Sequence, residues 1–571
     1  MTLTAKLTRA GAKTFAELAE DWAERFGDAP ALSSTLEALS YRGLALRVRR
    51  YARWAEAQGA GPGVVYGLLM RNRPDYLAAW MGVSLTGAAT ALLNTELPAP
   101  SLAHCLTASG VRELIVEPAL FETARAACAG LVNPPELWVL GACEGSRRLD
   151  LALADQSEAQ LPARPAISLS SPALHIFTSG TTGLPKAAIV SHRRMLSWAG
   201  WFAGMADTTA DDVMYDCLPL FHSVGGVAAT GAVLLNGGKV VLRERFSASA
   251  FWDDIRTEGC TLFQYIGELC RYLLASPPGP DDRRHDLRLV IGNGMRPEVW
   301  SDFVERFSPG RVLEFYAATE GVFTLCNAEG RVGAIGRFPP FVARNAPAEL
   351  VRLDPATGDI SRDTNVLAIR CGVDEPGEAV GLVDPSRGFD GYADKAASAA
   401  KLAHDLFSPG DLWFRTGDLM RKDAEGFFYF VDRLGDTFRW KGENVATTEV
   451  ASAVSSCPGV VAAIVFGIAV DGREGRAGMA VLSTTKVFDL KGLEAELAAR
   501  LPTYARPVFL RLTSELSMTE TLKHRSADYS AQGFDPDVVN DPLYWRDPQS
   551  GCYARLDRSV YERIIRGQQA L

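Results

Sequence analysis

The chain has 571 residues, of which 47% are hydrophobic and 22% charged, and this composition excludes a disordered or compositionally repetitive protein. Lys and Arg number 59 against 68 Asp and Glu, and the net charge of −9 argues against a nucleic-acid binder. The 10 cysteines form no Cys-x-x-Cys pair, which excludes a zinc ribbon and a disulfide framework and is typical of a reducing cytoplasm.

No membrane-targeting segment is predicted. The first thirty or so residues contain several acids and no continuous apolar stretch of the kind found in signal peptides. The most apolar long stretch, Met81 to Leu93, has about thirteen residues, whereas a membrane-spanning helix needs roughly twenty. We therefore expect a cytoplasmic protein, with peripheral attachment at the inner face of the membrane as the alternative.

Helical and strand patterns alternate as far as about residue 337, which is typical of α/β layers with mostly parallel strands. A Pro- and Ser-rich passage, Leu161 to Pro172, divides this region in two. The predicted helices are Phe15 to Phe26, Tyr41 to Gln58 and Phe251 to Glu258. The predicted strands are Val64 to Leu69, Glu113 to Val116, Val240 to Leu242, Leu289 to Ile291 and Val312 to Tyr316.

The rest of the chain predicts two smaller parts. Residues 338–431 are rich in Pro, Gly and Asp and indicate a small β-rich subdomain, with strands at Val366 to Arg370 and Phe427 to Val431. After Asp432 the pattern becomes compact α+β. Its predicted elements are a helix at Thr448 to Ser455, strands at Val460 to Phe466 and Met479 to Ser483, and a helix at Leu490 to Leu501. The predicted fold is thus α/β, with a large N-terminal domain (1–432) and a smaller, mobile α+β domain (433–571).

The strongest local signal is a loop that contains two glycines and four hydroxyl residues, Phe177-Thr178-Ser179-Gly180-Thr181-Thr182-Gly183-Leu184-Pro185-Lys186. The glycines allow close backbone approach, the hydroxyls supply donors and Lys186 adds positive charge, which together suit a polyphosphate. A Walker loop would have Gly-Lys-Ser/Thr opening a helix, whereas Pro185 here precedes an apolar strand. The loop is therefore predicted to join two strands, with Ser191 capping the next helix. An ordinary Gly/Thr hairpin is the alternative.

This loop resembles the signature loop of the adenylate-forming superfamily, which includes acyl-CoA synthetases. Further segments resemble the superfamily's motifs in the same order along most of the chain. They are Leu218 to His222, Tyr316 to Glu320 (with Ala317 in place of the usual glycine), Arg415 to Leu419, and a domain junction at Asp432 to Val445.

More specific strings resemble the branch of very-long-chain acyl-CoA synthetases and fatty-acid transport proteins. They are GDTFRWKGENVATTEV, GNGMRPEVW, RGFDGYADK and Thr521-Leu522-Lys523 followed by Gly533 to Pro536. A C-terminal extension, Asp541 to Leu571, also resembles this branch. Its apolar stripe of Leu556, Val560 and Ile564 is expected to dock on the small domain, with a membrane surface as the alternative.

The resemblance implies a two-step reaction, in which a carboxylate attacks the α-phosphorus of ATP and CoA thiol then attacks the acyl-adenylate. Asp418 would bind the ribose hydroxyls with Arg433 nearby, and Tyr316 would offer an aromatic face to adenine. Glu320 would ligate Mg²⁺, and Thr319 would donate to the α-phosphate and the carboxylate. The complete expected nucleotide site is Thr178, Ser179, Gly180, Thr181, Thr182, Gly183, Lys186, Tyr316, Ala317, Thr319, Asp418 and Arg433. Taken singly, such residues are more often turn or surface residues.

The resemblance also implies roles outside the nucleotide site. Lys523 would be the catalytic lysine of adenylation, although the glycine usual before it is absent, and a solvated loop lysine is the alternative. Gly435 would be the hinge between two domain orientations, and Gly442 would lie in the CoA region. His222 would wall or gate the acyl pocket, or else be a core residue.

One predicted helical face carries four large apolar side chains: Trp198, Trp201, Phe202 and Met205. Their spacing of i, i+3, i+4 and i+7 favours core packing, and lining an acyl tunnel is the alternative. Gly225 and Gly226 would leave room for the acyl chain.

The leading hypothesis is an ATP- and Mg²⁺-dependent long- or very-long-chain fatty acyl-CoA ligase. Its expected partners are a fatty acid, ATP and CoA, with no nucleic acid; a homodimer and peripheral membrane contact are left open. Transfer of the acyl group to a carrier-protein thiol is one alternative, and a fatty-acid uptake component is another.

Overall fold

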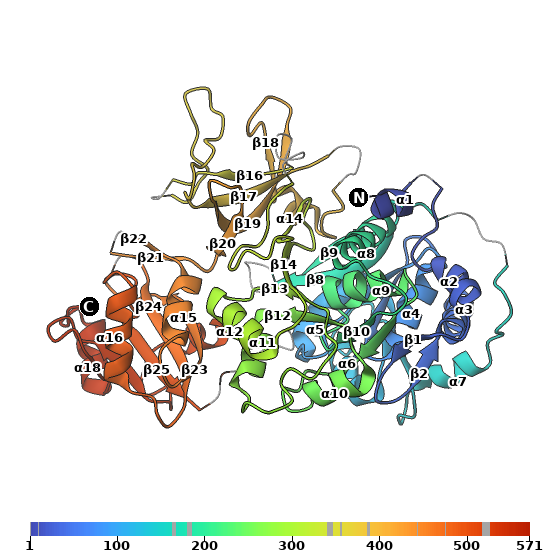
Figure 1. Ribbon diagram of the computed structural model, residues 1–571, viewed down its shortest axis with the longest axis horizontal. Helices are drawn as coiled ribbons and strands as arrows, with labels where there is room; N and C mark the ends of the chain where they lie inside the picture. The colour runs from blue at the N-terminus through green and yellow to red at the C-terminus, as the bar shows by residue number, and fades with distance from the viewer. Residues whose placement is uncertain are drawn as a thin grey trace. The chain divides into compact units, whose positions relative to one another are not determined.

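The computed structural model describes residues 2–9, 11–162, 167–179, 185–339, 347–354, 357–384, 389–441, 443–473, 475–514, 516 and 526–571. These form two compact units (Figure 1): an N-terminal unit of Met1–Gly336 with Val383–Leu402, and a C-terminal unit of Arg337–Leu382 with Ala403–Leu571. Both units combine sheets with helices, which confirms the predicted α/β class. The boundary between residues 432 and 433 stays a prediction.

The first sheet of the N-terminal unit has seven described strands in the order β7-β6-β5-β3-β4-β8-β9, all parallel to their neighbours except the β8–β9 pair. Successive side chains of β3 point to opposite faces, so that Leu68 packs in the core shared with α3 and α4 and Leu69 packs with α5 and α6. Helices therefore cover both faces, as the α/β pattern predicts. The strands are β3 (Val65–Leu69), β4 (Ala89–Leu92), β5 (Val111–Val116), β6 (Glu136–Val139), β7 (Arg147–Arg148), β8 (Pro172–Ser179) and β9 (Pro185–Ser191), and the helices are α3 (Tyr41–Ala57), α4 (Pro74–Ser84), α5 (Ala99–Ser109), η1 (Pro118–Leu120), α6 (Phe121–Cys128) and α7 (Leu149–Ala154).

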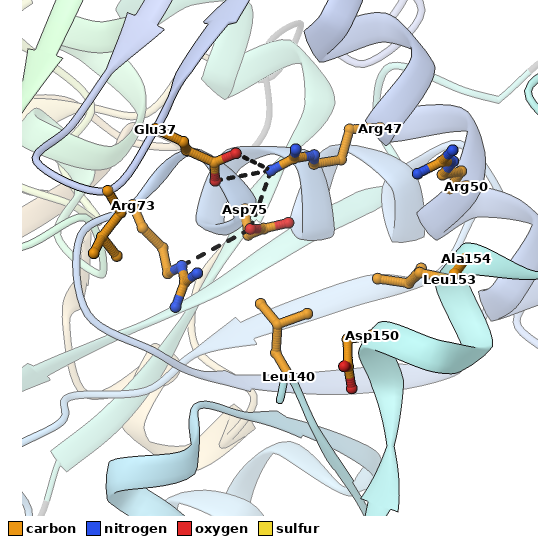
Figure 2. Close-up of a pocket in the computed structure, with 10 residues that line it drawn as sticks. Glu37, Arg47, Arg50, Arg73, Asp75, Leu140, Asp150, Leu153 and Ala154 are labelled. Carbon is orange, nitrogen blue, oxygen red and sulfur yellow. Dashed lines mark hydrogen bonds and ion pairs between the residues drawn. The ribbon is translucent and has the colours of Figure 1, made fainter. Parts of the chain in front are cut away.

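A cluster of charges joins α3 to the start of α4 (Figure 2). Arg47 Nη1 donates to both Glu37 carboxylate oxygens at 2.8 Å and to Asp75 Oδ2 at 3.2 Å. The Tyr51 hydroxyl donates to the other Asp75 oxygen at 3.1 Å. Every residue of α4 is buried, so this cluster fixes the first turn of a helix that is otherwise held by apolar packing.

The second sheet of the N-terminal unit contains, in the described chain, eight strands in the order β15-β14-β13-β12-β10-β11-β1-β2, of which the six from β14 to β1 are parallel. Its strands are β1 (Pro30–Ser33), β2 (Ala38–Ser40), β10 (Val213–Asp216), β11 (Lys239–Leu242), β12 (Leu262–Ile266), β13 (Leu289–Asn293), β14 (Val312–Ala317) and β15 (Thr324–Cys326). The accompanying helices are α1 (Thr2–Leu7), α2 (Leu18–Phe26), α8 (His192–Ala206), η2 (Val224–Ala229), α9 (Thr230–Leu234), α10 (Phe251–Glu258), α11 (Gly267–Ala275) and α12 (Pro297–Phe307). One hydrophobic core contains residues of both sheets and of α3, α4, α8 and α9, so this unit is held by a continuous interior.

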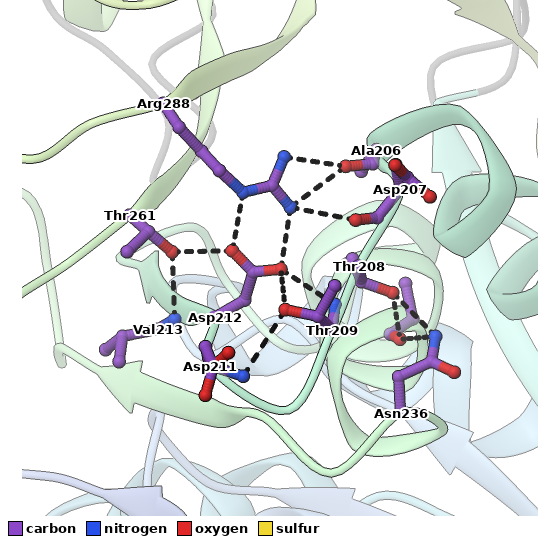
Figure 3. Close-up of polar contacts among 11 residues, drawn as sticks. Ala206, Asp207, Thr208, Thr209, Asp211, Asp212, Val213, Asn236, Thr261 and Arg288 are labelled. Carbon is purple, nitrogen blue, oxygen red and sulfur yellow. Dashed lines mark hydrogen bonds and ion pairs between the residues drawn. The ribbon is translucent and has the colours of Figure 1, made fainter.

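Helix α8 has a defined beginning and end. Ser191 caps its first turn by accepting a hydrogen bond from the Arg194 N–H at 3.3 Å, which confirms the predicted cap. At its last residue the Ala206 carbonyl accepts hydrogen bonds from Arg288 at 3.1 Å, and Arg288 also donates to the buried Asp212 carboxylate at 2.7 and 2.6 Å (Figure 3). Burial alone would raise the pKa of Asp212, yet the hydrogen bonds from Arg288, Thr209 and Thr261 hold it below its usual range.

The C-terminal unit begins with an antiparallel sheet, with described strands in the order β16-β17-β19-β18 and β20 paired with β19. The predicted strand at Val366 to Arg370 is wrong, because Val366 has a φ of 66° and the segment forms only isolated bridges. The Asp363 carboxylate accepts hydrogen bonds from the Asn365 and Leu367 N–H groups at 2.8 and 3.0 Å, and this turn interrupts the extended backbone. The elements are β16 (Ala348–Val351), β17 (Gly377–Leu382), β18 (Leu402–His404), β19 (Leu412–Lys422) and β20 (Phe428–Arg433); α14 (Lys395–Ala399) lies in the N-terminal unit.

The last part of the chain has a core of its own, whose buried members run from Phe438 to Ile564. Its described sheet has the order β23-β24-β25-β26-β27, beside a β21–β22 hairpin. The apolar stripe Leu556, Val560 and Ile564 is 2%, 8% and 0% exposed in this core, as expected for docking on the domain. The elements are β21 (Phe438–Trp440), β22 (Glu443–Val445), α15 (Thr447–Ser455), β23 (Val460–Ile468), β24 (Ala477–Thr484), α16 (Leu490–Arg500), β25 (Phe509–Thr513), α17 (Ser526–Gln532), β26 (Leu543–Arg546), β27 (Tyr553–Arg555) and α18 (Arg558–Ile565).

None of the helices in the described ranges is long and apolar enough to cross a bilayer.

Candidate nucleotide and acyl site

The predicted phosphate loop joins two antiparallel strands, as expected. Strands β8 and β9 pair so that Thr178 lies opposite Lys186 at the base of the loop. Gly180, Thr181, Thr182 and Gly183 lie outside the described residues, as does the Ser179 side chain. The base of the loop therefore brings a hydroxyl and an ammonium group to neighbouring positions on two strands.

The loop base meets the Thr-Glu segment that follows β14. The Thr178 hydroxyl donates to Glu320 Oε1 at 2.9 Å, although the two residues are 142 positions apart. The Tyr392 hydroxyl donates to the same oxygen at 2.5 Å. Thr319 is held through its carbonyl, which accepts from Arg194 Nη1 at 2.9 Å. Three predicted site residues, Thr178, Thr319 and Glu320, are thus brought together within one unit.

The residues that surround this group were not predicted from the sequence. Asp390 Oδ2 accepts hydrogen bonds from the Ser191 N–H and hydroxyl at 3.0 and 2.9 Å and lies 3.2 Å from Arg194 Nε. Burial lowers the pKa of the Arg194 guanidinium, and the charges of Asp390 and Glu320 oppose this shift. Asp390 and Tyr392 both occur in the string RGFDGYADK. This string indicated the branch but suggested no role for either residue.

Tyr316 and Ala317 end strand β14, directly before the Thr-Glu segment. The Tyr316 ring packs against Phe323 at a centroid distance of 5.5 Å and remains partly exposed. Both residues lie opposite β15, where Tyr316 pairs with Leu325 and Ala317 with Thr324. The strand pairing fixes the backbone that presents the aromatic ring, and stacking on adenine stays a prediction.

His222 follows β10 at the end of a loop that is held by Asn72. The Asn72 side chain donates to the Leu218 carbonyl at 2.8 Å and accepts from the Leu220 N–H at 2.9 Å. The partly exposed His222 ring packs against Phe221 with a centroid distance of 4.6 Å. A π-helix, η2, begins two residues later.

The glycines of η2 have a packing reason that the sequence did not reveal. A Cβ at Gly226 would lie 1.8 Å from the Leu220 carbonyl oxygen, so the backbone of η2 can approach the His222 loop only without a side chain there. A Cβ at Gly225 would lie 3.3 Å from the Leu218 carbonyl oxygen, which is tight but less severe. Gly226 is therefore required for the close approach of two backbone segments.

A small apolar cavity lies next to these segments. Its volume is about 20 Å³, and three of the four predicted stripe residues of α8 line it. Trp201 packs edge-on against Phe315 with a centroid distance of 5.7 Å. Ser223 also lines the cavity and shares a hydrogen bond of 3.3 Å with the Thr319 hydroxyl. The lining residues are Trp198, Trp201, Phe202, Ser223, Val224, Ala228, Phe315, Ala317, Ala318 and Thr324.

A more open cavity of about 420 Å³ lies at the charge cluster of Figure 2 and contains none of the predicted site residues. Its arginines face acids: Arg47 binds Glu37 and Asp75, and Arg50 lies 2.6 Å from Glu158. With these charges already compensated, the cavity lacks the excess positive charge that a nucleotide would need.

The remaining predicted residues belong to the C-terminal unit. Asp418 and Arg433 lie opposite each other on β19 and β20, and Arg433 Nε is 3.5 Å from Asp418 Oδ1. Gly435 lies in the turn that follows β20, which is closed by hydrogen bonds from the Asp436 and Thr437 N–H groups to the Arg433 carbonyl at 3.0 Å. Lys523 and Gly442 lie outside the described residues.

Comparisons with known proteins identify the family of the chain. Residues 19–366 match the family described as "AMP-binding enzyme", and residues 449–523 match the "AMP-binding enzyme C-terminal domain". The human long-chain fatty acid transport protein 1 is 40% identical over 528 residues, which cover 90% of this chain and 81% of that protein. The human long-chain fatty acid transport protein 3 is 40% identical over 516 residues, with coverages of 89% and 75%.

Among solved structures, the ATP-bound MatB from Rhodopseudomonas palustris superposes with a TM-score of 0.75 at 22% identity, covering 90% of this chain and 98% of that one. At this identity the similarity establishes the fold. The family match and the 40% identity establish more: the chain belongs to the AMP-binding enzyme family and, within it, to the group of the long-chain fatty acid transport proteins.

Proposed function

We propose that this protein ligates a long- or very-long-chain fatty acid to coenzyme A through an acyl-adenylate and releases AMP and pyrophosphate. The observation that carries the proposal is the meeting of Thr178, Thr319 and Glu320 beside an apolar cavity. A fatty acid needs a polar site and an apolar site next to each other, because the reaction occurs at its carboxylate while its long tail is apolar.

The phosphate-binding part of the site would be the loop from Thr178 to Lys186. The other proposed nucleotide-binding residues are Tyr316, Ala317, Thr319, Asp418 and Arg433. Catalysis of this type depends on positioning and charge neutralisation more than on covalent chemistry by the protein. Lys523 would supply positive charge in the adenylation step, and Gly442 would lie near the CoA thiol.

The described residues fit a Mg²⁺ ion at Glu320. No described side chain donates to Glu320 Oε2, whereas Oε1 accepts two hydrogen bonds. The described chain contains no group of three or more His, Cys, Asp or Glu that could hold a metal alone. Phosphate oxygens and water would therefore complete the shell, which is common for Mg²⁺. Bound there, the ion would neutralise phosphate charge.

The acyl chain would enter beside Trp198 and Trp201. The cavity of about 20 Å³ holds little more than one water-sized sphere, so these side chains must move for a long chain to bind. Both tryptophans are partly exposed and pack at the margin of the core, where a rotamer change disturbs fewer contacts than at a buried position. His222, two residues before Val224, would form the wall or gate of this route.

The relatives' names favour a second function, since they are called fatty acid transport proteins. With this function, ligation would retain a fatty acid that has entered the cell, or the protein would bind the fatty acid without ligating it. A cytoplasmic location with peripheral attachment at the inner membrane face suits either function, and a homodimer is compatible with both. Transfer to a carrier-protein thiol is the third candidate.

The test is a screen of carboxylic acids of increasing chain length by pyrophosphate release, with CoA and a carrier protein supplied separately. We expect long-chain acids to release pyrophosphate and CoA to be the thiol acceptor. Saturable fatty-acid binding without pyrophosphate release would favour the uptake function, and thioester formation on the carrier protein alone would favour the third candidate.

A further inference from the structure

The segment from Phe389 to Asp394 lies against the strand that leaves the phosphate loop. The Ile189 N–H donates to the Gly391 carbonyl at 2.8 Å, and the Ala393 N–H donates to the Ala187 carbonyl at 2.9 Å. Tyr392 pairs with Ala188 between these two hydrogen bonds. The backbone of the segment is therefore fixed to β9 like a short extra strand.

The Tyr392 side chain is held as firmly as its backbone. It is 6% exposed and packs with Ala188 and Ala397. The backbone N–H of Tyr392 donates to the Ser398 hydroxyl at 2.8 Å. A buried and packed ring on a fixed backbone loses little further entropy when its hydroxyl forms a hydrogen bond.

The Tyr392 hydroxyl points at the proposed metal ligand. It donates to Glu320 Oε1 at 2.5 Å, and the Thr178 hydroxyl donates to the same oxygen at 2.9 Å. A phenol keeps its proton at neutral pH, so the Tyr392 hydroxyl is a donor to this carboxylate. Two donors on Oε1 fix the rotation of the carboxylate and leave Oε2 without a described donor.

A second connection from the same segment holds the neighbouring backbone. Asp390 lies 3.2 Å from Arg194 Nε, and Arg194 Nη1 donates to the Thr319 carbonyl at 2.9 Å. Arg194 has only 12% of its side chain exposed, so this contact is little screened by water. The segment thus fixes both the backbone before Glu320 and the carboxylate of Glu320.

We propose that Tyr392 is a positioning residue for Glu320: it holds Oε1 so that Oε2 is presented to a divalent cation bound with ATP. This inference rests on the proposed function, because it takes Glu320 as the metal ligand. Tyr392 itself touches neither metal nor nucleotide; it lowers the cost of orienting the carboxylate.

The test uses Tyr392→Phe, which keeps the ring and its packing and removes only the donor. Mn²⁺ binding to the protein with ATP is measured by water proton relaxation, and the Mg²⁺ dependence of pyrophosphate release is measured in parallel. We expect Tyr392→Phe to weaken Mn²⁺ binding and to raise the half-saturating free Mg²⁺ by about tenfold, as for loss of a hydrogen bond to a charged group. AMP binding needs no metal; it should stay unchanged and shows that the site is folded.

Tyr215→Phe is the matched control. Tyr215 is also buried, and its hydroxyl donates to the Asp254 carboxylate at 3.1 Å, away from the proposed site residues. It should leave Mn²⁺ binding unchanged. In a Glu320→Gln background, Tyr392→Phe should cause no further loss, since the positioned carboxylate is gone.

Unchanged Mn²⁺ binding in Tyr392→Phe, or an additional loss in the Glu320→Gln background, would overturn the inference. Failure of the proposed function is distinguishable. In that case the unaltered protein would bind Mn²⁺ with ATP and respond to Tyr392→Phe, yet release no pyrophosphate with any fatty acid.

Discussion

The two units hold their charged candidate site residues in different ways. In the N-terminal unit, Glu320 accepts hydrogen bonds from two fixed hydroxyls, of which Tyr392 is almost fully buried. In the C-terminal unit, Asp418 and Arg433 are 3.5 Å apart, and 47% of the Arg433 side chain is exposed. An ion pair this exposed contributes only about 0–1 kcal/mol. The hydrogen bonds to Glu320 are formed before a ligand binds, whereas ligand binding can rearrange the Asp418–Arg433 pair at a small cost in free energy.

This contrast predicts that changes in the C-terminal unit separate the two half-reactions, whereas changes at Glu320 affect ATP chemistry directly. The largest effect is expected for Lys523→Ala. A compact ammonium on a flexible stem suits the space between carboxylate and α-phosphate. We expect acyl-adenylate formation to be abolished while supplied acyl-adenylate is still converted to acyl-CoA. The two steps are measured as pyrophosphate release and thioester formation.

Normal adenylation by a folded Lys523→Ala protein would contradict the role of Lys523, and so would an equal loss in both steps. Lys486→Ala is a suitable control, because it removes a lysine of the same part of the chain that has no proposed role.

Glu320→Gln should reduce adenylation by about 100-fold or more, since it removes the charge that we propose faces the cation while keeping the shape of the side chain. Added Mg²⁺ should restore little activity. Pyrophosphate release is the measurement, with the melting temperature as the folding check. Pyrophosphate release at the rate of the unaltered protein would remove Glu320 from the site.

Gly435→Pro tests whether the C-terminal unit must reorient. Proline fixes φ near −65° and removes an N–H, so it should restrict rotation at the proposed hinge. We expect one half-reaction to fall by at least about tenfold while the other is spared. Gly435→Ala, which keeps the N–H and does not fix φ, is the control. If both half-reactions fall equally in folded protein, Gly435 is not a hinge.

Asp418→Asn should have the smallest effect of the four. It removes a charged acceptor from the proposed ribose site and should raise the KM for ATP by about tenfold with a smaller change in kcat. Arg433→Gln should raise it less, because its contact with Asp418 is exposed. An ATP KM that is unchanged in Asp418→Asn would argue against ribose binding by this residue.

Much of the fold could be predicted from the sequence, because apolar periodicity and caps are local signals. The helix predicted at Thr448 to Ser455 is α15 (Thr447–Ser455), and the strand predicted at Val460 to Phe466 is β23 (Val460–Ile468). The prediction of a strand at Val366 was wrong because the Asp363 side chain forms a turn, which apolar content alone does not predict.

The candidate site was predictable only where its residues occur in motifs. Thr178, Thr319 and Glu320 were found in this way, and the structure brings them together. The role of Tyr392 could not be predicted, since it depends on a contact with a residue 72 positions away that the backbone pairing with β9 creates. The need for glycine at Gly226 likewise depends on the approach of two backbone segments.

Ligation through an acyl-adenylate is tested directly by incubating the unaltered protein with ATP, Mg²⁺, CoA and a long-chain fatty acid and quantifying AMP, pyrophosphate and acyl-CoA by mass spectrometry. We expect all three products in equal amounts, with pyrophosphate but no thioester when CoA is omitted. ADP and phosphate in place of AMP and pyrophosphate, or fatty-acid binding without any ATP cleavage, would contradict this expectation.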